Sequence, residues 1–425
     1  SLRESVKGTG DNLRPVFTPE GKTDGGKREV KMEEEISRKS KIRYFITGAA
    51  AACLALAFLY FTFMYLPVRT ESPGSPDSLS GYRKVKEIEN LIQRYYLGDY
   101  DEGKLADYMY LGLVSGLEDQ YSTYYTEEQY EELKKSQDGS YTGLGITLSQ
   151  SSEDGGIYVV DCVEDSPAGR AGVQTGDQIV SVNGTAIEEM TTSEVIDLIN
   201  SSSDGNVSLE LLREEKSLTL QMEMGTVEIQ SVDSRMLEGQ VGYIQITHFT
   251  GVTSQQFQDA YETLKEQGME KLIIDLRDNP GGLVSAVCDT LRQILPEGVI
   301  VYTEDKNGNR EEELCEGESP IDIPLAVLVN EESASASEIF AGAVKDYEIG
   351  TLVGTTTFGK GIVQDLFTLS DGSVLRLTVS HYYTPKGNNI HGTGITPDVE
   401  VEQQEDGSTD AQLEKALEIL GQEQD

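Results

Sequence analysis

The stretch Ile323-Pro324-Leu325-Ala326-Val327-Leu328-Val329-Asn330, followed two residues later by Ser333-Ala334-Ser335-Ala336-Ser337-Glu338, joins a strand pattern to a helix pattern. At such a turn, backbone N–H groups lack intrahelical partners and point outward. Donors of this kind can hold the oxyanion that develops during acyl transfer. The stretch therefore predicts an α/β layer with a candidate nucleophile at the turn. Its spacing does not choose among the three serines.

A candidate base for such a serine is Lys360, which stands between two glycines further along the chain. A lysine base must lose its proton near neutral pH, although its ordinary pKa is about 10.4. The next carboxylate along the chain is Asp365, and burial without an acidic neighbour lowers a lysine pKa. If Gly361–Phe367 is a strand, Gln364 shares a face with Lys360 and can orient its amine.

A second glycine-containing turn, Asp275-Leu276-Arg277-Asp278-Asn279-Pro280-Gly281-Gly282-Leu283, follows the apolar strand pattern that begins at Leu272. Glycine lets a backbone N–H approach a substrate oxygen closely. We therefore expect the amides of Gly281 and Ala336 to form an oxyanion hole.

Each of these motifs has a plain structural explanation. A Ser/Ala-rich turn is often only a helix N-cap, and Gly-Lys-Gly is usually a surface turn. The joint occurrence of both motifs with Asn-Pro-Gly-Gly favours the catalytic interpretation. Competing chemistry is weaker, because His248, His381 and His391 are isolated in the sequence and no His-Glu-x-x-His or Walker-type motif occurs. No metal site and no cofactor are expected.

The N-terminal part of the chain carries a membrane signal. Residues 1–43 hold 11 Lys/Arg and 8 Asp/Glu and are predicted to be a disordered cytoplasmic tail. Residues 44–65 contain no charge, so 44–66 is predicted to be a transmembrane helix, with an extracytoplasmic body after it. A cleaved signal peptide is the competing interpretation, but its apolar core is usually shorter. Residues 67–80 form a linker by composition.

The total net charge is −40, although the first 43 residues are net positive. Nucleic acid is not an expected partner of so acidic a protein, because nucleic-acid binding depends on Lys and Arg side chains that neutralise phosphates. The cysteines show neither metal-type spacing nor a disulfide framework, so we expect buried thiols.

Periodicity divides the remaining chain. Residues 81–138 show helical spacing, for example at Val85, Ile88 and Leu91, which predicts packing faces. Residues 227–402 alternate strand and helix patterns, which suits a mostly parallel sheet. Residues 403–425 form a tail with a short amphipathic helix.

Residues 139–226 resemble a PDZ domain over their whole length. The resemblance rests on Gly143-Leu144-Gly145-Ile146, on Ala171-Gly172, and on the stretch Asp177–Gly184 in order and spacing. In that family the first of these loops presents backbone N–H groups to a peptide's terminal carboxylate. The resemblance implies that a peptide adds as a strand to the sheet edge.

Together the motifs resemble the carboxyl-terminal processing peptidases, Ser/Lys proteases with an inserted PDZ domain. Further matching segments are Asp119-Gln120-Tyr121-Ser122-Thr123-Tyr124, Thr357-Phe358-Gly359-Lys360-Gly361, Tyr383-Thr384-Pro385-Lys386-Gly387 and Gly394-Ile395-Thr396-Pro397-Asp398. The resemblance implies that Ser335 is the nucleophile, Lys360 the base and Gln364 the third member. Gln120 departs from the family pattern, which commonly has proline there.

The resemblance also implies a fold of α/β and α+β parts: a membrane helix, a helical segment, and a PDZ domain inserted before an α/β protease core. The expected activity is a membrane-anchored serine endopeptidase acting on proteins with apolar C-termini outside the cytoplasm. The helical ends are expected to support a homodimer. The alternative is a catalytically inert, membrane-tethered PDZ scaffold.

Overall fold

The structure, a computed structural model, describes residues 79–403 and 409–422. The expected cytoplasmic tail, membrane segment and nearly all of the linker lie outside these residues. Within the described ranges, no helix is both long and apolar enough to cross a membrane. The chain divides into two compact units, residues 1–100 and 101–425.

The described helix of the first unit is α2, Leu79–Tyr95. Its apolar residues Val85, Ile88 and Leu91 were expected to pack, yet they are 42%, 48% and 50% exposed. The predicted helical periodicity is thus present, but within the described part of this unit these side chains stay exposed.

The second unit opens with α3 (Glu102–Ser115), β1 (Thr123–Tyr125) and α4 (Glu127–Asp138). The sequence predicted helix throughout this segment, and β1 is the difference. It forms because the edge of β18 (Val374–Tyr383) offers hydrogen-bond partners, with Tyr124 opposite Leu375. Tertiary pairing of this kind overrides local helical preference.

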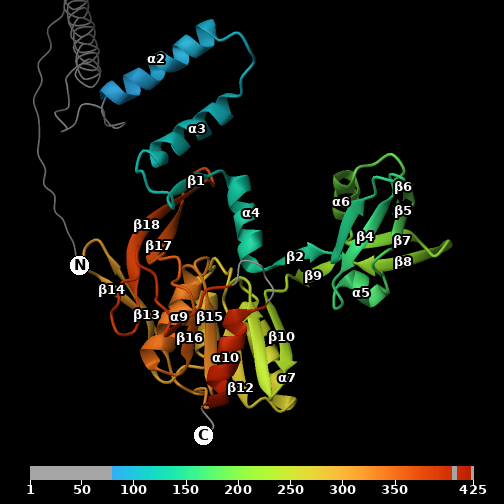
Figure 1. The fold of residues 1–425 in the computed structure, drawn as a ribbon. Coiled ribbons are helices and arrows are strands. Elements are labelled where there is room, and N and C mark those ends of the chain that lie inside the picture. Colours follow the sequence, from blue (N-terminus) through green and yellow to red (C-terminus); the bar gives the residue numbers. More distant parts are fainter. Residues whose placement is uncertain (1–78, 404–408, 423–425) are drawn as a thin grey trace, which may run out of the picture. The chain divides into compact units, whose positions relative to one another are not determined.

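The PDZ part is a sheet in the order β3-β4-β5-β7-β8, with β6 beside β5 (Figure 1). It is entered and left through an antiparallel ribbon of β2 and β9. Its core gathers buried residues such as Val159, Val195 and Leu209. The elements are β2 (Ser140–Gly143), β3 (Ile146–Gln150), β4 (Ile157–Cys162), α5 (Pro167–Ala171), β5 (Gln178–Val182), β6 (Thr185–Ala186), α6 (Thr192–Asn200), β7 (Asn206–Arg213), β8 (Lys216–Glu223) and β9 (Gly225–Glu228).

The main sheet of the protease part has the order β10-β11-β12-β15-β16-β19. From β11 to β19 every neighbouring pair is parallel, as the alternating strand and helix patterns predicted. The elements are β10 (Val232–Leu237), β11 (Val241–Ile246), α7 (Thr253–Glu266), β12 (Lys271–Asp275), α8 (Val284–Leu291), β15 (Leu325–Val329), α9 (Ala336–Tyr347), β16 (Thr351–Gly354), β19 (Val399–Glu400) and α10 (Ala411–Gln422).

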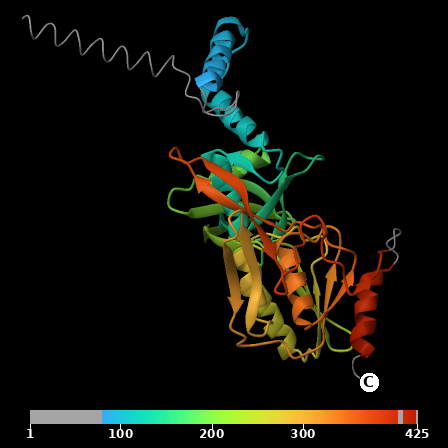
Figure 2. The ribbon, with the colours of Figure 1, turned by 90° about the vertical axis from the view of Figure 1, so that its left-hand side faces the viewer.

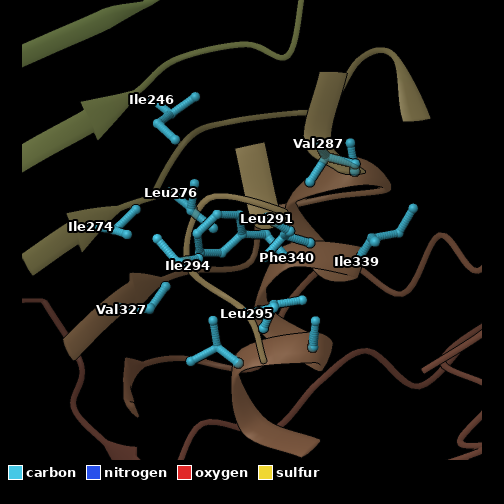
Figure 3. Packing of buried hydrophobic residues seen from close by; sticks show 14 of the residues in the cluster. Ile246, Ile274, Leu276, Val287, Leu291, Ile294, Leu295, Val327, Ile339 and Phe340 are labelled. Atoms are coloured by element: carbon cyan, nitrogen blue, oxygen red, sulfur yellow. The ribbon is translucent and has the colours of Figure 1, made fainter. Parts of the chain in front are cut away.

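Consecutive strand residues face opposite sides of this sheet, as a period of two requires. Ile274 and Val327 pack with helices α7, α8 and α9, while their neighbours Ile273 and Ala326 pack under α10. Figure 3 shows Phe340 of α9 among the residues of the first face, and Figure 2 shows α10 beside the sheet. Fully burying a side chain such as Phe340 contributes about 1.5–3 kcal/mol.

A second sheet has the order β1-β18-β13-β14 and carries β17 (Ile362–Thr368) on β18. β13 is Gly298–Asp305 and β14 is Arg310–Cys315. Val374 pairs with Tyr125 and with Thr368, so β1 and β17 occupy opposite edges of β18. This arrangement places β17 directly after the loop that carries Lys360.

Candidate active site

Ser335 occupies the turn between β15 and α9 and differs from the two serines beside it. Its backbone has φ 54° and ψ −111°, a conformation that L-residues rarely adopt. Ser333 and Ser337 are fully buried, and their hydroxyls donate to the carbonyls of Leu276 and Asn279 at 2.8 and 2.9 Å. Only Ser335 is partly exposed, so the geometry favours it where spacing could not.

Gly281 lies against the serine turn. A Cβ added to it would stand 2.6 Å from the Ala334 carbonyl oxygen and 2.9 Å from the Ala336 nitrogen, and its φ of 102° also requires glycine. Its N–H donates to the Asn279 side-chain oxygen at 2.8 Å. Within the described chain, no acceptor is found for the Ala336 N–H. The two expected oxyanion donors thus lie close together. The Ala336 N–H is open, whereas the Gly281 N–H is held in an Asx turn by Asn279.

The Glu338 carboxylate joins the serine turn to the lysine loop. It is fully buried and accepts the backbone N–H of Ser335 at 2.9 Å and that of Lys360 at 2.8 Å. The Thr357 hydroxyl and the Gly359 N–H donate to its other oxygen at 2.6 and 2.7 Å. Since a buried charge is stable only when hydrogen-bonded, this carboxylate fixes both loops to one point.

Tyr382 of β18 joins the same two loops from another side. Its hydroxyl lies 2.9 Å from the Ser335 carbonyl oxygen and 2.5 Å from that of Lys360. Burial raises the pKa of this hydroxyl well above its ordinary value, so it stays protonated as a donor. Sequence reasoning predicted neither the role of Tyr382 nor that of Glu338 in joining the two loops.

The surroundings of Lys360 lower its pKa. Burial is the main cause and the positive charge of Arg376 adds to it, while the carboxylates of Glu338 and Asp119 oppose it. The sequence suggested a lysine without acidic neighbours. Tertiary structure supplies two, but desolvation outweighs them.

The segment Asp119–Tyr124 forms part of the Lys360 environment. The Lys360 amine lies 4.7 Å from the centre of the Tyr121 ring, within the range of a cation–π contact. The Arg376 guanidinium donates to the Tyr121 carbonyl at 3.0 Å, and the Thr378 N–H donates to the Ser122 hydroxyl at 3.0 Å. These bonds hold the segment against β18. Among the described residues, no hydrogen bond joins the Lys360 amine to Ser335.

Gln364 lies on β17, as expected, but the strand begins at Ile362, after Lys360, and the register shift beside Gln364 places its extra residue on β18. Its amide nitrogen is 3.5 Å from the Ile362 carbonyl and 3.4 Å from the Thr378 hydroxyl. The structure therefore does not bring its side chain onto the Lys360 amine. The predicted third role stays a prediction.

The PDZ loop presents amides in one direction. The Leu144 carbonyl accepts the Ala168 N–H at 2.9 Å, and the Gly145 carbonyl accepts the Val163 N–H at 2.9 Å. A trans peptide points its C=O and the following N–H in opposite directions. The N–H groups of Gly145 and Ile146 therefore face away from these partners, beside the edge strand β3.

Comparison with known proteins identifies two domains in the chain. The model of peptidase family S41 matches residues 240–401, and that of the PDZ domain matches residues 132–212. The carboxy-terminal processing protease CtpA of Bacillus subtilis (strain 168) is 34% identical over 359 residues, 84% of this chain and 76% of that protein. The carboxyl-terminal-processing protease of Synechocystis sp. is 38% identical over 321 residues, which cover 72% of this chain and 75% of that protein.

Among solved structures, the photosystem II D1 C-terminal processing protease matches with 29% identity and a TM-score of 0.46, over 80% of this chain and 92% of that one. The sequence matches define a serine endopeptidase with a PDZ domain ahead of an α/β core. The chain belongs to peptidase family S41, among the carboxyl-terminal processing proteases.

Proposed function

We propose that the chain is a membrane-anchored endopeptidase that recognises protein C-termini through its PDZ domain and cleaves with a dyad of Ser335 and Lys360. One observation carries the dyad: the buried Glu338 carboxylate holds the N–H groups of both residues, at 2.9 and 2.8 Å. Two distant loops fixed to one charge keep a nucleophile and a base in register.

In the proposed reaction, the neutral Lys360 amine takes the Ser335 proton while Oγ attacks the scissile carbonyl carbon. The oxyanion forms beside the N–H groups of Ala336 and Gly281. The Gly281 N–H breaks its hydrogen bond to the Asn279 side chain and donates to the substrate oxygen instead. The protonated lysine then gives its proton to the leaving amine. Water, deprotonated by the same lysine, attacks the acyl carbon, and the lysine then returns the proton to Ser335 Oγ as the acyl group leaves.

Gln364 is the proposed third member, which orients the lysine amine. The contacts that now hold its amide are 3.4 and 3.5 Å long and therefore weak. Rotation of its side chain toward Lys360 costs little on this account. The proposal assigns Gln364 to positioning and leaves proton transfer to Lys360.

Substrate recognition is assigned to the PDZ loop Gly143–Ile146. β3 is an edge strand, so a peptide can add beside it, and the nearby amides can receive a terminal carboxylate. The preference for an apolar last residue rests on the resemblance to the PDZ family, because Leu144, Val195 and Ile199 are buried in the domain core. Proteins with apolar C-termini are the proposed substrates.

The membrane anchor at 44–66 and the extracytoplasmic placement of the catalytic part rest on the sequence pattern alone. We also propose a homodimer, which exposed apolar residues on two helices support. Helix α2 exposes Ile88 and Leu91, and α3 exposes Met109 and Leu113, at 43–57% of their surface. Apolar helix faces of this kind mark protein interaction sites.

The test compares the full chain in detergent with Ser335→Ala and Lys360→Ala on a peptide with an apolar C-terminus. Either change is expected to lower kcat by about 10³-fold or more, with peptide binding retained. Wild-type activity in either variant overturns the dyad. Peptide binding without cleavage by the wild-type chain indicates instead a PDZ scaffold.

A further inference from the structure

The chain contains three histidines, and the fold brings two of them together. The rings of His381 and His391 have centroids 5.7 Å apart and planes inclined at 55°. They come from different elements, since His381 lies on β18 and His391 in the turn after it. Both residues are exposed, so solutes reach them. Neither has a place in the reaction described above.

Two imidazoles at this separation suit a divalent transition metal. Zn²⁺ binds histidine nitrogen at about 2.0–2.1 Å, and a tetrahedral angle between two such bonds puts ring centroids about 5 Å apart. The observed pair reaches that geometry after a closure of less than about 1 Å. Imidazole is a ligand for zinc, copper and nickel and not for hard cations such as Mg²⁺.

A carboxylate lies on the strand next to His381. Glu304 pairs with His381 across β13 and β18, and directly opposite residues of an antiparallel pair point to one face. A carboxylate beside a ligating imidazole orients it and raises its basicity. The described residues contain no group of three or more protein metal ligands. The pair therefore supplies two protein ligands and water completes the shell.

The two histidine segments bracket the loop that carries Lys360. The Gly392 N–H donates to the Gly359 carbonyl at 2.8 Å, and the Tyr382 N–H donates to the Gly361 carbonyl at 3.1 Å. A Cβ on Gly361 would stand 2.6 Å from the backbone nitrogen of His391, so the turn that carries His391 is packed tightly against the Lys360 loop. Movement of His391 toward β18 is therefore transmitted to Gly361.

We propose that His381 and His391 form a binding site for a divalent transition metal such as Zn²⁺, and that the bound metal restrains the Lys360 loop and slows peptide cleavage. The metal ties β18 to the turn at His391 across the loop. Lys360 then stays in the arrangement seen here, with its amine over Tyr121. The part about cleavage rests on the proposed role of Lys360, whereas metal binding does not.

The first test is Zn²⁺ binding to the full chain in detergent, by calorimetry and by the shift of the melting temperature. His381→Ala and His391→Ala are each expected to lose the binding and the shift, and His248→Ala serves as the matched control that keeps both. Mg²⁺ is expected to give neither. Equal Zn²⁺ binding by the His381→Ala/His391→Ala double variant overturns the site.

The second test is peptide cleavage with increasing Zn²⁺. Wild type and His248→Ala are expected to lose activity saturably, at the concentration that fills the site, while His391→Ala keeps its activity. Zn²⁺ bound at the pair with unchanged kcat overturns the restraint on the loop. If the wild-type chain cleaves no peptide at all, the proposed function fails while the binding result stands by itself.

Discussion

The Lys360 amine lies 4.7 Å from the centre of the Tyr121 ring, although the two residues are far apart in the sequence. A ring face stabilises the ammonium over the neutral amine, by about 0.5–1 kcal/mol at partly exposed sites. It therefore opposes burial, which is the main cause that lowers the Lys360 pKa. This balance makes the pH dependence of cleavage sensitive to Tyr121.

Tyr121→Leu removes the ring but keeps an apolar cover over the amine. The Lys360 pKa is expected to fall further, and because cleavage needs the neutral amine, kcat/KM below the pKa rises about two- to fivefold. The rising limb of the pH–rate profile moves to lower pH. Tyr121→Phe keeps the ring and serves as the control. A limb that moves equally in both variants contradicts the cation–π assignment.

Arg376 acts in the opposite direction. Its positive charge lowers the Lys360 pKa, so Arg376→Gln is expected to raise that pKa and move the rising limb to higher pH. At neutral pH the rate falls, while at high pH it recovers toward the wild-type value. The measurement is kcat/KM across pH 6–10. A uniform loss at every pH indicates instead that Arg376 acts only by holding the Tyr121 carbonyl.

Glu338 is expected to be essential for both stability and activity. Glu338→Gln places a donor where four donors converge, so at least one hydrogen bond is lost and others are strained. Bonds to a buried charge are worth about 1.5–3 kcal/mol each, and we expect a loss of at least about 3 kcal/mol in the free energy of unfolding. Urea unfolding measures that loss, and a peptide assay measures kcat.

Tyr382→Phe is the milder companion. It removes the hydroxyl that lies between the Ser335 and Lys360 carbonyls, and we expect the free energy of unfolding to fall by about 1–2 kcal/mol. We also expect kcat to fall by a larger factor than KM changes. Unchanged kcat in a folded Tyr382→Phe protein contradicts a positioning role for this residue.

Local patterns predicted the parts of the site that one segment carries. The strand before Ser335 is a continuous apolar run followed by a helix pattern, and the alternation of strand and helix patterns along the chain predicted a mostly parallel sheet. Spacing could not single out Ser335. The choice depends on the tertiary structure, in which the carbonyls of Leu276 and Asn279 accept hydrogen bonds from the other two serine hydroxyls.

The missed features all depend on contacts between distant segments. Tyr382 reaches Ser335 and Lys360 only after β18 folds beside the main sheet, and Tyr121 covers Lys360 through bonds to residues some 255 positions away. The start of β17 has no strong sequence signal either. Because the strand begins at Ile362, the alternation from which the direction of Gln364 was predicted does not extend to Lys360.

The last prediction concerns the PDZ loop. Gly145 has φ 80°, and a Cβ added there would stand 2.1 Å from the Ser166 Cβ. Gly145→Ala is therefore strained and crowded at once, and the loop must shift the amides proposed to hold a terminal carboxylate. We expect the Kd for a peptide with an apolar C-terminus to rise about tenfold or more, since a misplaced charge-assisted contact costs about 1.5–3 kcal/mol.

The matched control is Gly155→Ala. Gly155 has φ 74°, and an added Cβ meets nothing within 4 Å, so this change carries similar backbone strain without a clash. It lies in the turn between β3 and β4, away from the loop, and should leave peptide affinity unchanged. Fluorescence anisotropy with the free-acid peptide and its C-terminal amide separates carboxylate capture from apolar contact. Equal affinity of Gly145→Ala and wild type for the free acid contradicts the assignment of this loop, because the carboxylate is then held elsewhere.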